Sequence, residues 1–124
     1  MNSDLSPEAI TRLETQQVIW FASVRPDGQP HLAPVWFVWH TGKFYIGTDP
    51  KSVKSHNIQH NPGVVLALED GVHPVICEGN AQVIAAPLPE DLLTAFYQKY
   101  EWDLTKEVQY NLMVEITPEK WLGW

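Results

Sequence analysis

The chain has 124 residues, of which 44% are hydrophobic and 19% are charged, and its formal net charge is −7. This size and composition predict one compact domain over residues 1–124 and argue against a disordered chain. The acidic balance argues against a nucleic-acid-binding surface, and a polyanionic ligand would need a local basic patch.

Cysteine content and hydropathy indicate in which cellular compartment the protein is expected. Cys77 is the single cysteine, which excludes an internal disulfide and suits a reducing compartment. No apolar stretch approaches the roughly 20 residues of a membrane span, and no charged leader with an apolar run opens the sequence. We therefore expect a cytoplasmic protein without membrane contact. A domain of this size encloses little space, so a sizeable ligand is expected at a surface shared between subunits.

In the first half of the sequence, turn signals alternate with runs of β-branched and aromatic residues. Ser6 and Pro7 are typical of a helix start, and this short helix is expected to end near Gln17. The runs predict three strands, over residues 18–24, 31–39 and 44–47. Both faces of the second strand are apolar, so one of them needs a ligand or a second subunit as cover.

The second half predicts two strands, a helix and a last strand, over residues 64–69, 74–86, 89–101 and 108–116. Thr117 and Pro118 then predict a turn into a short tail that carries Trp121 and Trp124. For these two tryptophans, contact with a ligand or a second subunit and simple packing at the chain end are both open. The pattern as a whole indicates a mainly β fold, a small antiparallel barrel with three modest helices.

A strand that runs directly into a helix start is the strongest candidate for a binding site. Asp49 is expected to cap a helix that has Pro50 in its first turn. Lys51, Ser52 and Lys54 crowd that turn, where the helix dipole favours acidic side chains. An anion held by the lysines and the free backbone amides would remove this conflict. An exposed helix start with solvated lysines is the alternative.

Other chemical patterns are weak. His56 and His60 have the i, i+4 spacing of a helical zinc site, but the glutamate of a metalloprotease is missing and no motif supplies a third ligand. Cys77 has no histidine partner motif, and the glycines form neither a G-x-G-x-x-G nor a Walker sequence. We therefore expect no metal site and assign no catalytic residue.

Four segments follow one another in a characteristic order: residues 23–37, the strand and turn through Tyr45, the helix start Ser52-x-Lys54-x-x-Asn57 and the stop at Asn61 and Pro62. In this combination residues 8–124 resemble the flavin-binding split-barrel proteins, the superfamily of pyridoxamine 5'-phosphate oxidase and the flavin- and deazaflavin-dependent oxidoreductases. The resemblance implies a six- to seven-stranded antiparallel split β-barrel with peripheral helices. It also implies a homodimer with the cofactor in a groove between the subunits.

The resemblance further implies which residues bind the cofactor. The strand-to-helix segment would hold the cofactor phosphate, the second strand would carry the flavin ring, and C-terminal residues of the partner would approach the edge of the ring. The matching residues are Thr48, Lys51, Ser52, Val53 through its backbone and Lys54 for the phosphate, Ala33, Pro34, Val35 and Trp36 for the ring, and Trp121 and Trp124 for the edge.

Two departures argue against pyridoxamine phosphate as the substrate. The pyridoxamine phosphate oxidases carry an arginine and a lysine on the second strand for phosphate contact, whereas His31 and Trp36 stand at those positions here. Their C-terminal Arg-x-His substrate element also has no counterpart in this sequence. The substrate is therefore expected to be a different small planar molecule.

The implied cofactor is FMN, with deazaflavin as the alternative. Deazaflavin carries an oligoglutamate tail that profits from an extended basic groove, and eight lysines and arginines leave few for one. FMN needs a compact dianion site, which Lys51, Lys54, two hydroxyls and helix amides supply. We expect an FMN-dependent oxidoreductase. The alternatives are a non-catalytic flavin store, sensor or electron carrier, and a haem protein with His31 or His73 as axial ligand.

Overall fold

The computed structural model describes residues 5–122, which form seven strands, three α-helices and one short 3-10 helix. The strands are β1 (Val18–Val24), β2 (Pro30–Trp36), β3 (Val38–His40), β4 (Lys43–Thr48), β5 (Gly63–Ala67), β6 (Ile76–Ile84) and β7 (Leu112–Leu122), and the helices are α1 (Pro7–Thr15), α2 (Val53–His60), α3 (Glu90–Tyr100) and η2 (Leu104–Lys106). Each strand pairs antiparallel with its neighbours, in the order β2-β1-β5-β6-β7-β4-β3.

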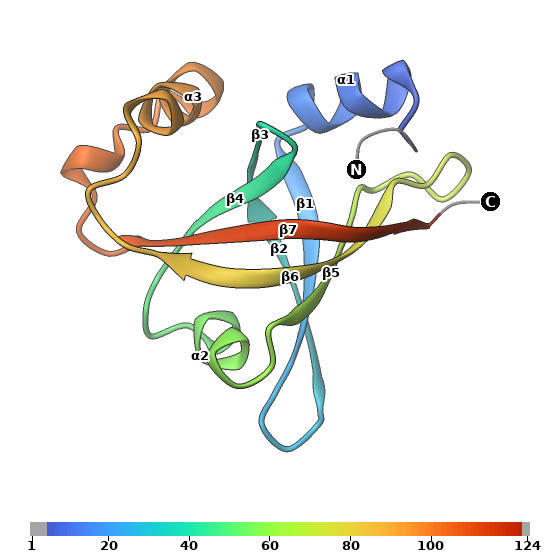
Figure 1. The fold of residues 1–124 in the computed structure, drawn as a ribbon, viewed down its shortest axis with the longest axis horizontal. Helices are drawn as coiled ribbons and strands as arrows, with labels where there is room; N and C mark the ends of the chain where they lie inside the picture. The colour runs from blue at the N-terminus through green and yellow to red at the C-terminus, as the bar shows by residue number, and fades with distance from the viewer. Residues whose placement is uncertain (1–4, 123–124) are drawn as a thin grey trace.

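The sheet curls around an apolar interior. Figure 1 shows α1 and α3 at one end of the curled sheet and α2 at the other end. β2 and β4, which share no hydrogen bonds, contact each other, so the sheet turns back towards itself as an incomplete barrel. The prediction of a mainly β, antiparallel split barrel of six to seven strands with peripheral helices is thereby confirmed.

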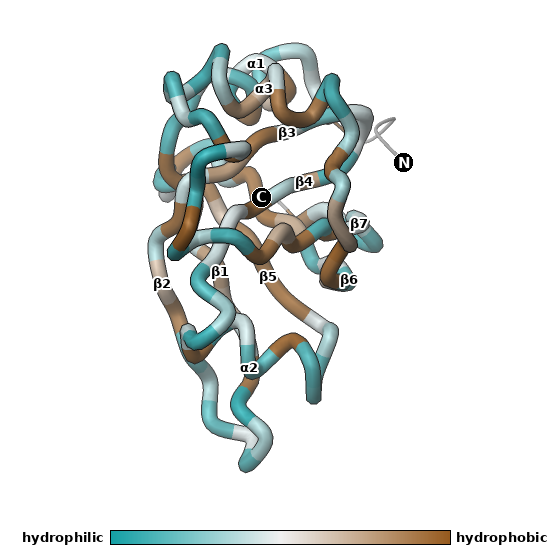
Figure 2. The backbone as a smooth tube through the Cα atoms, turned by 90° about the vertical axis from the view of Figure 1, so that its left-hand side faces the viewer, coloured by the Kyte–Doolittle hydropathy of each residue, from teal (hydrophilic) through white to brown (hydrophobic). Residues whose placement is uncertain are grey.

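Two apolar clusters hold the elements together. The larger one fills the curled sheet and includes Leu13, Ile19, Phe21, Phe37, Phe44, Ile46, Leu66 and Ile116, all almost fully buried. A smaller one lies between α3 and the sheet and consists of Val38, Tyr45, Leu92, Phe96 and Met113. Figure 2 shows hydrophobic stretches along the strands and hydrophilic ones in the connections. α3 is therefore anchored to the sheet by its own apolar face.

The start of α2 differs from the sequence prediction. Ser52, and not Asp49, is the N-cap: its hydroxyl oxygen accepts a hydrogen bond from the backbone N–H of Ser55 at 3.2 Å. Asp49 instead begins a turn, in which its carboxylate accepts from the N–H of Lys51 and its carbonyl accepts from the N–H of Ser52. Lys51 therefore precedes the helix, while Lys54 lies in its first turn. The start of α1 at Ser6 is as predicted.

The strand predicted over residues 31–39 is two strands. β2 pairs with β1, β3 pairs with β4, and Phe37 stands between them. The prediction is wrong here because alternation in the sequence does not record a change of hydrogen-bonding partner. The outward face of β2 is exposed in the isolated chain, with Leu32 at 61% and Trp36 at 49% of full exposure.

The last strand also differs from its prediction. β7 begins at Leu112 and runs through Thr117 and Pro118, where a turn was expected, to Leu122. Pro118 lies opposite Gly79 next to a register shift between β6 and β7, where Glu119 has no partner on β6, and proline is tolerated at such bulges. Residues 108 and 110, predicted to begin the strand, lie in the connection between η2 and β7.

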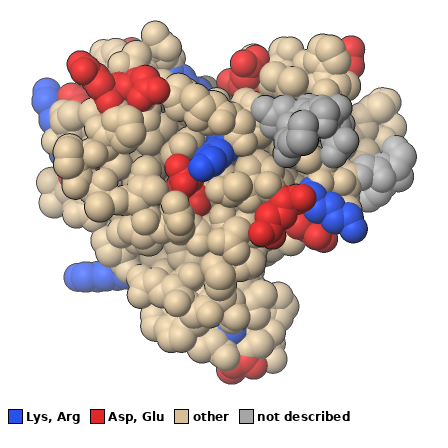
Figure 3. Space-filling model, viewed as in Figure 1, with Lys and Arg blue, Asp and Glu red and all other residues tan. Residues whose placement is uncertain are grey.

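Charged side chains are unevenly distributed on the face shown in Figure 3. Acidic groups gather over α3, whereas lysines and arginines lie singly or beside acidic groups. Among the described helices, none is both long and apolar enough to cross a membrane.

Candidate functional site

A groove of about 540 Å³ opens where β2 ends. β2, β4, α2 and the connection between α3 and β7 contribute its lining, which consists of Pro34, Val35, Trp36, Gly47, Lys54, Trp102, Glu107 and Tyr110. Four of these residues are among those predicted to bind the cofactor ring or its phosphate: Pro34, Val35, Trp36 and Lys54. The structure thus brings parts of both predicted regions to one groove.

Aromatic rings form one side of the groove. Trp36 stacks on Tyr100 with ring centroids 4.5 Å apart and planes 4° apart. Trp102 meets Trp36 edge-on at 5.9 Å, and Tyr110 meets Trp102 edge-on at 6.4 Å. We call these four residues the aromatic wall. One face of the Trp36 ring is covered by Tyr100, and the side chain is about half exposed. The ring therefore offers a planar ligand a fixed apolar surface.

Glu107 holds the outer part of the aromatic wall. Its carboxylate accepts hydrogen bonds from Trp102 Nε1 at 2.8 Å and from the backbone N–H groups of Gln109 and Tyr110 at 3.0 Å. The backbone bond from Tyr110 and the bond from Trp102 lower the pKa of Glu107 below its usual range. Glu107 is therefore an ionised positioning group at neutral pH and has no proton to give to a ligand.

Gly47 makes the close approach of Trp102 possible. A Cβ at position 47 would lie 2.9 Å from Cη2 of the Trp102 indole, closer than real Cβ contacts. The absence of a side chain at this position of β4 therefore lets the indole of Trp102 approach the strand closely and line the groove.

Hydroxyl groups are linked in a chain at the start of α2. Thr48 Oγ1 lies 2.6 Å from Ser55 Oγ, and Ser52 Oγ lies 2.8 Å from the same atom. Ser55 Oγ donates its own proton to the carbonyl of Asp49 at 2.7 Å. Thr48 and Ser52, both predicted to contact the phosphate, thus fix the shape of the turn through Ser55, a fully buried residue that sequence reasoning missed.

The two predicted lysines lie in different surroundings. Lys54 lines the groove and is half-buried, and burial lowers the pKa of its ammonium, against the opposing effect of Asp49. Within residues 5–122, no carboxylate forms an ion pair with Lys54. Lys51 instead lines a separate hollow of about 410 Å³ with Asp49 and Gln109. The unpaired cation of the groove is therefore Lys54.

Two further predicted residues lie close to the groove but do not line it. Val53 is the first residue of α2, and its side chain is 46% exposed. Ala33 lies on β2, partly buried, on the same face of the strand as Val35. Sequence reasoning placed both in the right segments, and their contact with a cofactor stays a prediction.

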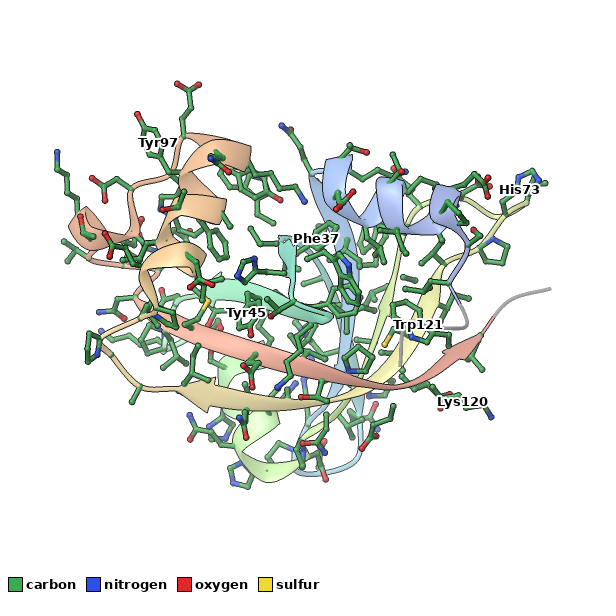
Figure 4. The ribbon with its side chains drawn as sticks, turned by 45° about the horizontal axis from the view of Figure 1, so that its top comes forward. Phe37, Tyr45, His73, Tyr97, Lys120 and Trp121 are labelled. Atoms are coloured by element: carbon green, nitrogen blue, oxygen red, sulfur yellow. The ribbon has the colours of Figure 1, made fainter. Side chains whose placement is uncertain are left out.

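Trp121 does not lie on a tail. It belongs to β7, opposite Cys77, and its ring centroid is 5.8 Å from that of Trp39 and 6.0 Å from that of Phe44. Figure 4 shows it towards the C-terminal end of β7, far from Tyr97 on α3. Trp121 therefore packs on its own subunit, and its approach to the partner's cofactor stays a prediction. Trp124 lies outside the described residues.

The remaining candidates show no arrangement for catalysis. The rings of His56 and His60 lie 4.8 Å apart with their planes tilted by 52°, and within the described range no group of three metal-ligating side chains gathers. Cys77 is buried, and burial raises the pKa of its thiol to about 12, so it carries no thiolate at neutral pH. Gly47, Trp102, Glu107 and Tyr110 are the groove residues that sequence reasoning did not assign to a site.

Comparisons with known proteins bear on the groove and the fold together. The heme storage protein HutZ from Vibrio cholerae has a TM-score of 0.82 at 15% identity, with 96% of this chain and 94% of that one covered. An F420 reductase has a TM-score of 0.72 at 23% identity, covering 90% and 94%. An FAD-binding protein from Mesorhizobium loti has a TM-score of 0.71 at 19% identity, covering 94% and 92%. At these identities the likeness shows the fold alone.

Sequence comparison gives the family. No curated protein matches the chain. The family model described as pyridoxamine 5'-phosphate oxidase matches residues 5–124, which is nearly the whole sequence. With the curled antiparallel sheet and the groove at the end of β2, this match means that the chain belongs to the pyridoxamine 5'-phosphate oxidase family of split-barrel proteins.

Proposed function

We propose that the protein is an FMN-binding oxidoreductase that transfers hydride between flavin and a small planar substrate other than pyridoxamine phosphate. The observation that carries this proposal is the combination, in one groove, of an unpaired half-buried lysine and a rigid aromatic wall. Lys54 suits the phosphate of FMN and the exposed face of Trp36 suits its ring system. Because the chain has a formal net charge of −7, a lysine without an ion-pair partner is unusual in it.

Family relatives with different ligands set the alternatives. Solved structures similar to this one include an F420 reductase, a FAD-binding protein and a heme storage protein. Deazaflavin would extend its oligoglutamate tail along the groove, where Glu107 is ionised and repels it. The compact dianion of FMN meets Lys54 and the start of α2 instead. The charges around the groove therefore favour FMN.

A second copy of the chain is the proposed cover of the outer face of β1 and β2. All the outward-facing residues of these strands are apolar: Val18, Trp20, Ala22 and Val24 on β1, and Pro30, Leu32, Pro34 and Trp36 on β2. Trp36 belongs both to this face and to the groove. A homodimer that buries the face would therefore place the groove at the subunit interface and complete its wall.

In the proposed reaction FMN supplies the hydride chemistry, and the chain supplies binding and orientation. Lys54 neutralises phosphate charge at one end of the groove. Trp36, held by Tyr100, fixes the plane of the ring and excludes water from one side of it. Among the described lining residues, Glu107 is committed to Trp102 and to backbone amides, so we assign no acid or base.

Titration of the purified apoprotein with FMN, monitored by flavin fluorescence, tests binding. We expect one FMN per subunit and at least tenfold weaker binding of riboflavin, which has the same ring without the phosphate. Haem or deazaflavin bound in preference to FMN would contradict the cofactor assignment.

Anaerobic addition of NADPH, NADH or reduced deazaflavin to the FMN complex then tests catalysis through bleaching of the flavin band near 450 nm. Bleaching, and its reversal by an electron acceptor, is the expected result. Bound flavin that none of these donors reduces would indicate a flavin store or sensor and contradict the oxidoreductase assignment.

A further inference from the structure

Three basic residues lie together between the β1–β2 hairpin and α2, and none of them forms an ion pair within residues 5–122. His31 on β2 is the register partner of Ser23 on β1, so both side chains lie on the same, inward face of the sheet. Ser23 Oγ accepts a hydrogen bond from Asn57 Nδ2 of α2 at 3.0 Å. Lys54 precedes Asn57 by three residues and therefore lies on the same side of α2. This contact places Lys54 beside His31.

Arg25 supplies the third charge. It follows β1 directly, its N–H donates to the carbonyl of Gln29, and its guanidinium donates to the carbonyl of Pro30 at 3.2 Å. The guanidinium therefore lies next to β2 at the position before His31. Burial is the largest cause that lowers the pKa of His31, and the charges of Arg25 and Lys54 lower it further.

The nearby acidic groups accept hydrogen bonds from backbone N–H groups and form no ion pair with this cluster among residues 5–122, although the charge of Asp49 acts on Lys54. Asp27, in the same hairpin, accepts from the N–H of Gln29, and Asp49, on the other side of Lys54, accepts from the N–H of Lys51. Within residues 5–122 neither Arg25 nor Lys54 takes part in an ion pair. The like charges of Arg25 and Lys54 repel each other, and an anion bound between them would remove this repulsion.

The imidazole itself also lacks a partner. His31 Nδ1 is buried and has no hydrogen-bond partner among the described residues. A buried Nδ1 with no group to which it could donate favours the neutral tautomer with the proton on Nε2. A buried polar atom without a partner costs free energy, and such atoms are uncommon in folded chains. His31 is thus held in its neutral form until a negative charge arrives.

We propose that His31 is the third basic group of the phosphate site and takes up a proton when a phosphorylated ligand binds, so that affinity for the ligand rises as the pH falls from 8.5 to 6.5. The inference rests on the proposed binding of FMN, and it names the regulation of the same site: proton concentration controls how firmly the chain holds its cofactor.

The direction of the pH dependence follows from the linkage between proton binding at His31 and ligand binding. In the free chain His31 is mostly neutral at pH 7, because its pKa is lowered. A phosphate dianion offsets the charges of Arg25 and Lys54, which raises the pKa of His31 in the complex. Between the free and bound values the complex holds one more proton, so affinity increases on acidification by up to tenfold per pH unit. A phosphate monoester has its second pKa near 6, so the dianion is its main form over this range.

FMN titrations at pH 6.5, 7.5 and 8.5 test the inference, with riboflavin as the probe that lacks the phosphate. We expect FMN to bind about threefold to tenfold more tightly at pH 6.5 than at pH 8.5, and riboflavin affinity to change little. His31→Gln should remove the pH dependence, and His31→Lys, which keeps a charge at this position, should bind FMN tightly with little dependence on pH. Calorimetry of the wild-type chain in two buffers of different ionisation enthalpy should show net proton uptake with FMN.

The outcomes separate the two proposals. FMN binding with the same affinity from pH 6.5 to 8.5, or with the same pH dependence in His31→Gln, would overturn the role of His31 and leave the FMN site standing. The absence of FMN binding at every pH would overturn the proposed function and this inference together. The wild-type calorimetry decides the matter without variants, because zero proton uptake with FMN bound contradicts the inference directly.

Discussion

The hydroxyl of Tyr100 accepts from the N–H of Phe37 at 2.9 Å, and its one proton lies within hydrogen-bond reach of two carbonyls, that of Phe37 at 2.8 Å and that of Gln17 at 2.7 Å. Phe37 stands between β2 and β3, where the chain changes strand partners and leaves the N–H and carbonyl of Phe37 without a ladder bond. The ring of Tyr100 stacks on Trp36 at the same place. α3 therefore determines both where β2 ends and how Trp36 lies in the groove.

Tyr100→Phe keeps the ring and removes the hydroxyl, so it separates these two roles. We expect a loss of about 1–3 kcal/mol in the free energy of unfolding, because the N–H of Phe37 loses its partner, while the Phe37 carbonyl keeps the bond from Lys99 Nζ. Urea denaturation measures the loss. Tyr97→Phe is the matched control: its ring projects outward from the same helix (Figure 4) and is 55% exposed, so stability should hardly change. Equal stability of Tyr100→Phe and the wild type would contradict the bridging role.

Lys54→Ala should weaken FMN binding by about tenfold to a hundredfold, the equivalent of ~1.5–3 kcal/mol for a charge-assisted hydrogen bond. Riboflavin affinity should stay close to that of the wild type, because riboflavin has no phosphate for the lysine to contact. Lys120→Ala removes the same charge at an exposed position on β7, remote from α2 (Figure 4), and should leave FMN affinity unchanged. Unaltered FMN affinity in Lys54→Ala would show that the phosphate lies elsewhere.

Much of the fold could be predicted because its signals are local. Ser6 and Pro7 begin α1 through a cap that is encoded within four residues, and turn residues mark the hairpin between β1 and β2. The predicted link between β2 and Lys54 came from the family resemblance, since nothing in their spacing brings them together. The structure places both in one groove.

The other groove residues could not be predicted, because their signal is tertiary. Tyr110 continued the alternating pattern of the last strand, yet it lies before β7 because Glu107 binds its backbone N–H and shapes the connection. Trp102 reaches the groove because Gly47, 55 positions earlier, leaves room for its indole. Pro118 looked like the end of a strand, but β7 continues through it because the register against β6 shifts there and leaves Glu119 without a partner. Each depends on a contact with a distant segment.

Ser55→Ala tests the hydroxyl chain at the start of α2. Ser55 Oγ is the common partner of Thr48, Ser52 and the carbonyl of Asp49, and it is fully buried. Its removal leaves three polar groups without that partner, so we expect a loss of about 1–3 kcal/mol in stability and weaker FMN binding.

Thr94→Ala is the control for Ser55→Ala, because the exposed Thr94 hydroxyl bonds only the carbonyl of Glu90 within α3. It should change the unfolding free energy by less than about 0.5 kcal/mol. Thermal denaturation and FMN titration of both variants provide the comparison. A Ser55→Ala variant as stable as the control would mean that the turn does not depend on the hydroxyl chain.

Gly47→Ala should disturb the aromatic wall, because the new methyl group would lie 2.9 Å from the Trp102 indole. We expect the indole to shift, a loss of stability of about 1–3 kcal/mol and a changed tryptophan emission spectrum. Gly63→Ala is the matched control, since a Cβ there meets no atom within 4 Å. Identical spectra and stability for the two variants would contradict the close packing of Trp102 on β4.

Lys99 should make stability rise with pH in the mildly alkaline range. Its Nζ donates to the carbonyl of Phe37 at 2.9 Å and lies 3.8 Å from the centroid of the Phe37 ring. Burial lowers the pKa of Lys99 to about 8. Its pKa in the unfolded chain is about 10.4, so between these values the unfolded chain binds more protons and stability increases with pH. Below pH 8 both states are protonated and Lys99 contributes no pH dependence.

The rise in unfolding free energy is smaller than the full pKa shift of Lys99 would give. Lys99 is only half-buried, and solvent screens its charge. From pH 7.5 to pH 9.5 we expect a gain of about 1 kcal/mol in the wild type, which Lys99→Met should lack. The range must end near pH 9.5: burial raises the pKa of Tyr100 to about 12, so above pH 10 the unfolded chain loses its tyrosine proton first and stability falls.

Urea denaturation of wild type, Lys99→Met and the exposed-lysine variant Lys106→Met at pH 7.5, 8.5 and 9.5 isolates the contribution of Lys99. A Lys99→Met curve parallel to that of the wild type would assign the alkaline rise to another group.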